Sequence, residues 1–214
     1  MKKELINAVW DLNEEKVATM LNTIGGDFFK KDNMDGENPL LLAAQLGATN
    51  IVRLLLDHSF DVNHQEESGS TALMWAALAG KEETVKFLLE KNAYVNQKDN
   101  AGITPLLMAV MRGKEKVVSL LISHGADVEA TDKQGMNALM WASMIQRHDI
   151  VSMLIDSGAD TERVFQNGMS SMMRLVLKES IERAQHLKSD QMPKKITSFK
   201  KGKGVDLLAR QNGD

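Results

Sequence analysis

The residue types that most often carry catalysis or metal binding are scarce in this 214-residue chain. There is no cysteine, so disulfide bonds, thiolate nucleophiles and cysteine-ligated zinc are excluded. The five histidines have no metal-ligand spacing, and we expect them to be surface or helix-capping residues. His58 and His124 fall near the expected ends of two helices, where histidine interacts favourably with the negative end of the helix dipole.

Two polar segments resemble ligand-binding motifs only superficially. Residues 201–204 read Lys-Gly-Lys-Gly, which lacks the spacing of a phosphate-binding loop. Asp32, Asp35 and Glu37 lie close together in sequence. The pattern of a calcium-binding loop nevertheless fails at Met34. We therefore expect no catalytic, cofactor or metal site, and we do not expect the chain to be an enzyme.

The three tryptophans are the other residues that could meet a ligand. Trp75 and Trp141 are each preceded by a methionine. Aromatic residues and methionine at helical spacing usually belong to a core, so we expect these indoles to pack between helices. The alternative is an aromatic ledge that faces a ligand. We expect Trp10 to seal the N-terminal end of the molecule.

The elements that position these residues follow from an internal repeat of fixed period. Glycine recurs at one constant step, and such a period is the mark of a repeat architecture. The glycines are Gly36, Gly69, Gly102, Gly135 and Gly168. The same register holds leucine, alanine and valine at Leu40, Leu73, Leu106 and Leu139, at Ala43, Ala76, Ala109 and Ala142, and at Val52, Val85, Val118 and Val151. One unit of a turn and two helices is thus copied four times, which makes a surface rather than a cleft.

Each unit carries signals for where its helices begin and end. Threonine or asparagine precedes the first helix as an N-cap, at Asn38, Thr71, Thr104 and Asn137. Glycine is expected to end that helix in a left-handed conformation, at Gly47, Gly80 and Gly113. Gln146 replaces this glycine in the fourth unit, so we expect that helix to end differently. The second helix is expected to end at Ser59, Asn92, Gly125 and Gly158.

The constant step between the glycines and the Thr-Pro-Leu-x-x-Ala motif at 104–109 resemble the ankyrin repeat over residues 34–165. The resemblance implies an all-α repeat solenoid, in which helix-turn-helix units are joined by short β-hairpin loops. The histidine that usually follows Thr-Pro-Leu is absent. Its place is taken by Leu41, Met74, Leu107 and Met140.

On this basis we predict repeats between two caps, followed by a tail. The predicted segments are a degenerate or capping N-terminal repeat at 1–33, repeats at 34–66, 67–99, 100–132 and 133–165, a C-terminal cap helix at 166–187, and a basic tail, expected to be disordered, at 188–214. The cap is expected to be one longer helix or a bent pair.

Charge differs between the body and the tail. Residues 187–214 hold seven Lys or Arg against three Asp, a net +4, which leaves −7 for residues 1–186 because the whole chain carries −3. No apolar run approaches the length of a membrane span. Acidic and polar residues interrupt any signal-peptide core near Met1. We expect a cytoplasmic protein, with the nucleus as the alternative.

Two functions remain open. The first is a protein-protein interaction module, an adaptor, scaffold or inhibitor that binds a partner protein or peptide on the concave face of the stack. The second is a nucleic-acid- or chromatin-associated factor that uses the basic tail. The body disfavours nucleic acid because it is acidic and has no basic stripe. We expect no cofactor, and we expect the chain to be a monomer.

The resemblance also implies where the partner binds. In ankyrin repeats, partners usually meet the hairpin tips and the inner helices. The corresponding positions here are Leu46, Leu78, Ile103, Met111, Arg112, Met136, Met144, Ile145 and Met169. The alternative is that neighbouring repeats cover these side chains. The resemblance further implies that Asn63 and Asn96 are of the kind modified by asparaginyl hydroxylases.

Overall fold

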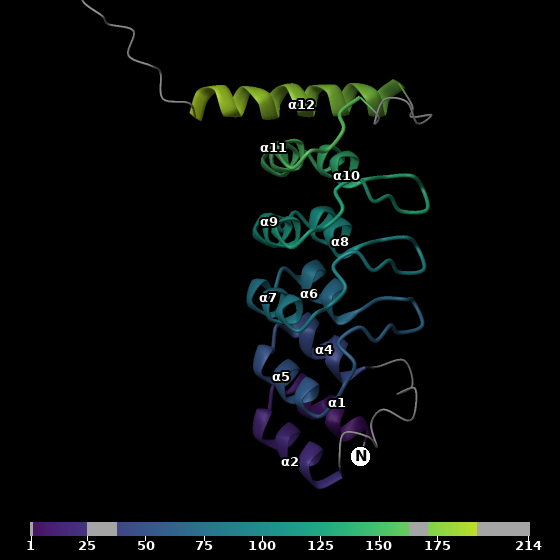
Figure 1. The fold of residues 1–214 in the computed structure, drawn as a ribbon, viewed down its shortest axis with the longest axis vertical. Helices are drawn as coiled ribbons and strands as arrows, with labels where there is room; N and C mark the ends of the chain where they lie inside the picture. The colour runs from purple at the N-terminus through teal and green to yellow at the C-terminus, as the bar shows by residue number, and fades with distance from the viewer. Residues whose placement is uncertain (1, 25–37, 163–170, 192–214) are drawn as a thin grey trace, which may run out of the picture.

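The protein is an elongated stack of helix pairs, described here from a computed structural model. The structure describes residues 2–24, 38–162 and 171–191. The first helices of the pairs are α1 (Lys2–Trp10), α4 (Pro39–Leu46), α6 (Ala72–Ala79), α8 (Pro105–Met111) and α10 (Ala138–Met144). The second helices are α2 (Glu14–Ile24), α5 (Thr49–Asp57), α7 (Glu82–Glu90), α9 (Glu115–Ser123) and α11 (His148–Asp156). A longer helix, α12 (Ser171–Gln191), crosses the C-terminal end (Figure 1).

The two sets of helices form two columns, and hairpin loops project from the side of the first helices (Figure 1). Within the described residues every regular element is helical. The loops close by backbone hydrogen bonds, as where the Asp99 N–H donates to the Ile103 carbonyl over 3.0 Å. Neighbouring loops are also bonded to each other. The N–H of Asn100 donates to the Ser68 carbonyl, and that of Lys133 to the Ala101 carbonyl, both over 2.9 Å.

The first helices begin at the predicted caps. The side chains of Asn38, Thr71, Thr104 and Asn137 each accept a hydrogen bond from an N–H in the first turn. Gly47, Gly80 and Gly113 all have positive φ, as predicted. The prediction for the fourth unit was wrong. Gln146 has a φ of 56° and donates to the Ser143 carbonyl, so this helix ends in the same left-handed turn.

The second helices also end as predicted. Ser59, Asn92, Gly125 and Gly158 have positive φ, which the non-glycine residues adopt at some cost in strain. His58 and His124 are the C-caps of α5 and α9. Each Nδ1 atom lies 2.8 Å from the carbonyl oxygen four residues earlier, which confirms their capping role.

The core runs through the whole stack. All twelve aligned leucine, alanine and valine residues of the four repeats are at most 1% exposed. The residues that replace the usual histidine of the motif, which include Met74 and Met140, are buried as well. Apolar contact between adjacent repeats therefore occupies the place where the family has a polar side chain.

The two ends are closed differently. At the N-terminal end Leu5, Val17 and Leu21 are fully buried, but Trp10 is 54% exposed. The expectation that Trp10 seals this end was wrong, because the smaller aliphatic residues already fill it. At the C-terminal end α12 is one continuous helix that reaches Gln191, beyond the predicted end of the cap at 187. Its buried residues Leu177, Ile181 and Ala184 join the common core, and residues 192–214 lie outside the described residues.

Candidate functional site

The surface formed by the hairpin loops and the first helices is called the inner face here. The left-handed turn that ends each first helix shows which residues of different repeats are equivalent on this face. Leu12, with a φ of 53°, ends α1 as Gly47 ends α4, and the same pair of backbone bonds follows each of them. Trp10 therefore corresponds to Gln45 of the next unit, two residues before the left-handed turn. Further along the stack this position holds Leu78, Met111 and Met144.

The structure describes eight of the nine predicted partner-binding residues, and Met169 lies outside the described residues. Met144 is 46% exposed, Ile145 is 37% exposed, and Arg112 is exposed too. Leu78 and Met111 are half-buried. The remaining three, Leu46, Ile103 and Met136, are half-buried and pack against the core.

The aligned positions from Trp10 to Met144 form one row along the inner face. The sequence interpretation missed a second row on the same face. It lies three residues before the first and comprises Leu42, Trp75, Met108 and Trp141. Side chains three residues apart on a helix lie on one side of it, so Trp75 neighbours Leu78 and Trp141 neighbours Met144. This spacing was the signal in the sequence that could have joined the tryptophans to the predicted site.

Both tryptophans of this row are half-buried and pack against the core, which confirms the packing interpretation. Each also donates its indole N–H to a hairpin carboxylate nine residues earlier, which the sequence analysis did not foresee. Trp75 Nε1 lies 3.2 Å from Glu66 Oε1, and Trp141 Nε1 lies 3.0 Å from Asp132 Oδ2.

The two carboxylates are used differently. Asp132 is only 5% exposed, and its Oδ1 accepts the backbone N–H groups of Gln134 and Met136, both over 2.9 Å. Glu66 is half-buried, and the Ser68 hydroxyl donates to its Oε1 over 2.8 Å. The Ser68 oxygen in turn accepts the N–H of Ser70. A serine hydroxyl in the second repeat thus accepts the hairpin N–H that an aspartate carboxylate accepts in the fourth.

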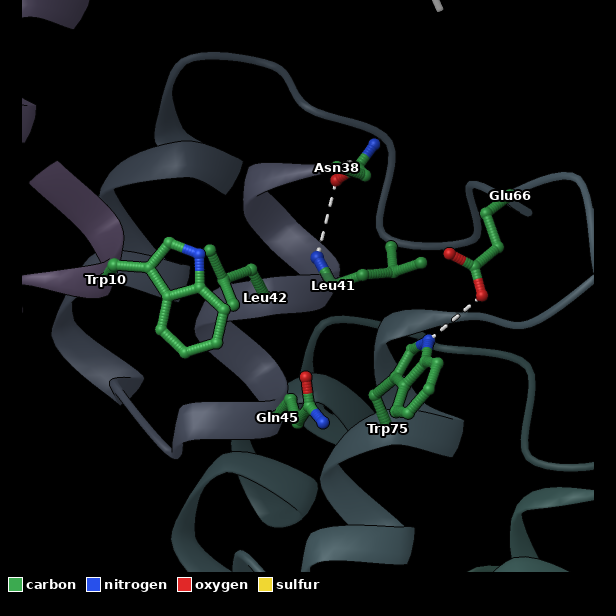
Figure 2. A pocket seen from close by; sticks show the side chains of 7 residues that line it. All are labelled: Trp10, Asn38, Leu41, Leu42, Gln45, Glu66 and Trp75. Carbon is green, nitrogen blue, oxygen red and sulfur yellow. Dashed lines mark hydrogen bonds between the residues drawn. The ribbon is translucent and has the colours of Figure 1, made fainter. Parts of the chain in front are cut away.

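A pocket of about 160 Å³ opens on the inner face between α1, α4 and α6. Its lining residues are Trp10, Asn38, Leu41, Leu42, Gln45, Glu66 and Trp75. Figure 2 shows the two indoles on opposite sides, with the two leucines and Gln45 between them and Glu66 beside Trp75. The pocket thus has apolar and aromatic walls and one carboxylate.

The ion pair that most affects a pKa lies at the start of α11, where Arg147 is the N-cap residue and Asp149 lies in the first turn. Hydrogen bonds from the Arg147 guanidinium lower the pKa of Asp149 to about 2, and the pKa of Arg147 is raised by the same bonds. Arg147 Nη1 also donates to the Gly113 carbonyl over 2.6 Å. This contact ties the fourth repeat to the third, and a Cβ added at Gly113 would displace the Arg147 guanidinium, because it would lie 2.5 Å from Nη1.

Asn63 and Asn96 form similar ties between repeats. Asn63 Oδ1 accepts the N–H of Tyr94, and Asn96 Oδ1 accepts the N–H of Asp127, each over 2.8 Å. Both amides also donate to a carbonyl near the end of the second helix in the next unit. These two side chains therefore hold adjacent loops together.

Two further properties concern the described residues alone. In that part of the chain, no three His, Asp or Glu side chains gather closely enough to hold a metal ion. None of the helices there combines the length and apolar character that crossing a bilayer requires.

The repeat geometry agrees with the family comparison. A family model described as ankyrin repeats in three copies matches residues 5–99 and 94–164. The chain belongs to the ankyrin-repeat family. No curated protein matches the sequence at a significant level. Ankyrin repeats are general protein-protein interaction modules and are typically not enzymes.

Proposed function

We propose that this protein is an adaptor, scaffold or inhibitor that binds a partner protein or peptide on the inner face, the concave side of the stack. The observation that carries the proposal is the exposure of large apolar side chains there. Trp10, Met144 and Ile145 are between 37% and 54% exposed and all lie on or directly after first helices. Large apolar side chains left exposed along one face are typical of interaction sites, and flexible methionine adapts to different partner shapes.

The contact surface that we propose consists of the eight described residues of the predicted partner-binding set. The exposed residues Arg112, Met144 and Ile145 contact the partner directly, and half-buried Leu78 and Met111 line the floor between them. Leu46, Ile103 and Met136 belong to the floor through their exposed edges, because each also packs against the core. The alternative, a nucleic-acid-associated factor, depends on the basic tail, and residues 192–214 of that tail lie outside the described residues.

The test places a negative charge on the inner face. Met144→Glu should reduce partner capture from a cell lysate at least tenfold, about 1.4 kcal/mol, because a carboxylate must lose its water where apolar contact is needed. Met111→Glu should do the same. Ser119→Glu on α9 adds an equal charge on an outer helix and should leave capture unchanged.

Thermal unfolding separates contact from core. Met144→Glu and Ser119→Glu should melt within a few degrees of the parent chain. A large drop in melting temperature for Met111→Glu would show that Met111 belongs to the core. Undiminished capture by correctly folded Met144→Glu would move the site away from the inner face.

A further inference from the structure

The pocket between Trp10 and Trp75 has the composition of a site for a cation with an apolar stem. Trp10 is the more exposed of its two aromatic walls, and an indole left 54% exposed is unusual because indoles are on average highly buried. Leu42, half-buried, supplies apolar surface between the two indoles. Among the described residues that line it, Glu66 is the one acidic side chain, and none is lysine, arginine or histidine.

The carboxylate of Glu66 retains a free acceptor. Its Oε1 accepts the Trp75 indole N–H and the Ser68 hydroxyl. Its Oε2 accepts no hydrogen bond from the described part of the chain. A half-buried carboxylate with an open oxygen beside an aromatic face attracts a cation through charge, hydrogen bonding and the negative face of the ring.

The fourth repeat lacks this feature although it has the same tryptophan. Asp132 is one methylene shorter, is 5% exposed, and uses one oxygen for the hairpin backbone and the other for Trp141. Its carboxylate is therefore closed off from solvent. The open oxygen of Glu66 comes from the longer side chain and from Ser68, which takes over the bond to the backbone.

We propose that this pocket binds an arginine side chain of the partner. The guanidinium donates to Glu66 Oε2 and stacks on the Trp75 indole, while the alkyl stem packs on Leu42 and against Trp10. Arginine fits better than lysine because its planar group can stack on a ring and donate to a carboxylate at the same time. This assignment rests on the proposed function, since it names the partner chemistry at one end of the inner face.

The test uses a small probe and the full chain. N-acetyl-arginine N-methylamide is titrated while the three indole N–H signals are followed by ¹H–¹⁵N NMR, with each signal assigned from a tryptophan-to-phenylalanine variant. The signals of Trp10 and Trp75 should shift and saturate in the millimolar range. The signal of Trp141 should not move, because its carboxylate partner is buried.

Two matched controls isolate the charge. The citrulline analogue of the probe has the same shape without the charge and should bind at least tenfold more weakly. Glu66→Gln keeps an acceptor for Trp75 and Ser68 but loses the negative charge, and it should weaken arginine binding by a similar factor. The lysine analogue should bind several-fold more weakly than arginine.

Several results would overturn the assignment. They are equal shifts from the citrulline analogue, unchanged affinity in Glu66→Gln, lysine binding as tight as arginine, equal movement of Trp141, or no saturable shift. The outcome is separable from that of the proposed function. Failure of the arginine probe leaves the effect of Met144→Glu on partner capture intact, whereas full capture by Met144→Glu refutes the inner-face function without changing the NMR titration.

Discussion

The second and fourth repeats place tryptophan at the same position and stabilise it in different ways. In the fourth repeat a buried aspartate binds two backbone N–H groups and the indole, so that hairpin and helix are held by one side chain. In the second repeat Glu66 binds the indole and Ser68 binds the backbone, and one oxygen of the glutamate accepts no hydrogen bond from the described residues. One methylene thus separates a structural carboxylate from one that is available to a ligand.

The largest expected effect tests whether Asp132 contributes more to the stability of the fold than Glu66 does. Asp132→Ala removes three hydrogen bonds to a buried carboxylate and should lower the free energy of unfolding by about 3 kcal/mol. Glu66→Ala should cost only about 1 kcal/mol, because Ser68 still accepts the N–H of Ser70.

Urea unfolding followed by circular dichroism measures both values. Asp132→Asn retains an acceptor and serves as the milder control, with a loss between the other two. Equal losses in the free energy of unfolding for Asp132→Ala and Glu66→Ala would contradict the comparison, because they would mean that the two carboxylates stabilise the fold equally.

The fold could be predicted from the sequence because each repeat contains its own local signals for where helices begin and end. The constant step between glycines, the threonine and asparagine caps and the left-handed turns are local signals, and each reappears in the structure where the register puts it. Gln146 was the local failure. Its side chain is poorly suited to a left-handed turn, but the packing of α10 and α11 imposes that turn as it does in the other repeats.

The pocket could not be predicted because it depends on contacts between repeats. Trp10 and Trp75 belong to units that are not consecutive in the chain, and their facing arrangement follows from the stacking of α1, α4 and α6. The exposure of Trp10 depends on how completely the small aliphatic residues fill the N-terminal end, and a helical pattern does not encode that. The bond between Glu66 and Trp75 likewise depends on how the hairpin folds back over α6.

The second expected effect concerns the start of the second helix, where Lys81 and Glu83 of the second repeat correspond to Arg147 and Asp149 of the fourth. Asp149 has a pKa of about 2 in the folded protein, below that of the unfolded chain, because Arg147 donates to it. A lowered pKa stabilises the fold at pH values above the unfolded pKa and loses this effect as the pH falls toward 2. Since Asp149 is 40% exposed, we expect about 1 kcal/mol after allowing for solvent screening.

Asp149→Asn should therefore be about 1 kcal/mol less stable than the parent chain at pH 7, and the difference should shrink as the pH falls from about 5 to about 3. Urea unfolding at several pH values measures this. Arg147→Lys keeps the charge but loses the paired geometry, so it should reproduce part of the effect. A difference that is the same at every pH would show that Asp149 acts through packing rather than through its charge.

The smallest expected effect tests the position where the fourth repeat departs from the others. Gln146 has a φ of 56°, and Gly80 occupies the same place in the second repeat with a φ of 73°. Gln146→Gly should raise the free energy of unfolding by about 0.5 kcal/mol, because relief of left-handed strain exceeds the entropy that glycine adds to the unfolded chain. Gly80→Ala is the reverse change and should destabilise by about 1 kcal/mol, since an added Cβ would also lie 2.7 Å from Cδ of Lys114. If Gln146→Gly is destabilising instead, the Gln146 side chain makes a contact that stabilises the fold by more than the backbone strain costs. The turn after α10 would then depend on a side-chain contact that the glycine turns of the other repeats do not have.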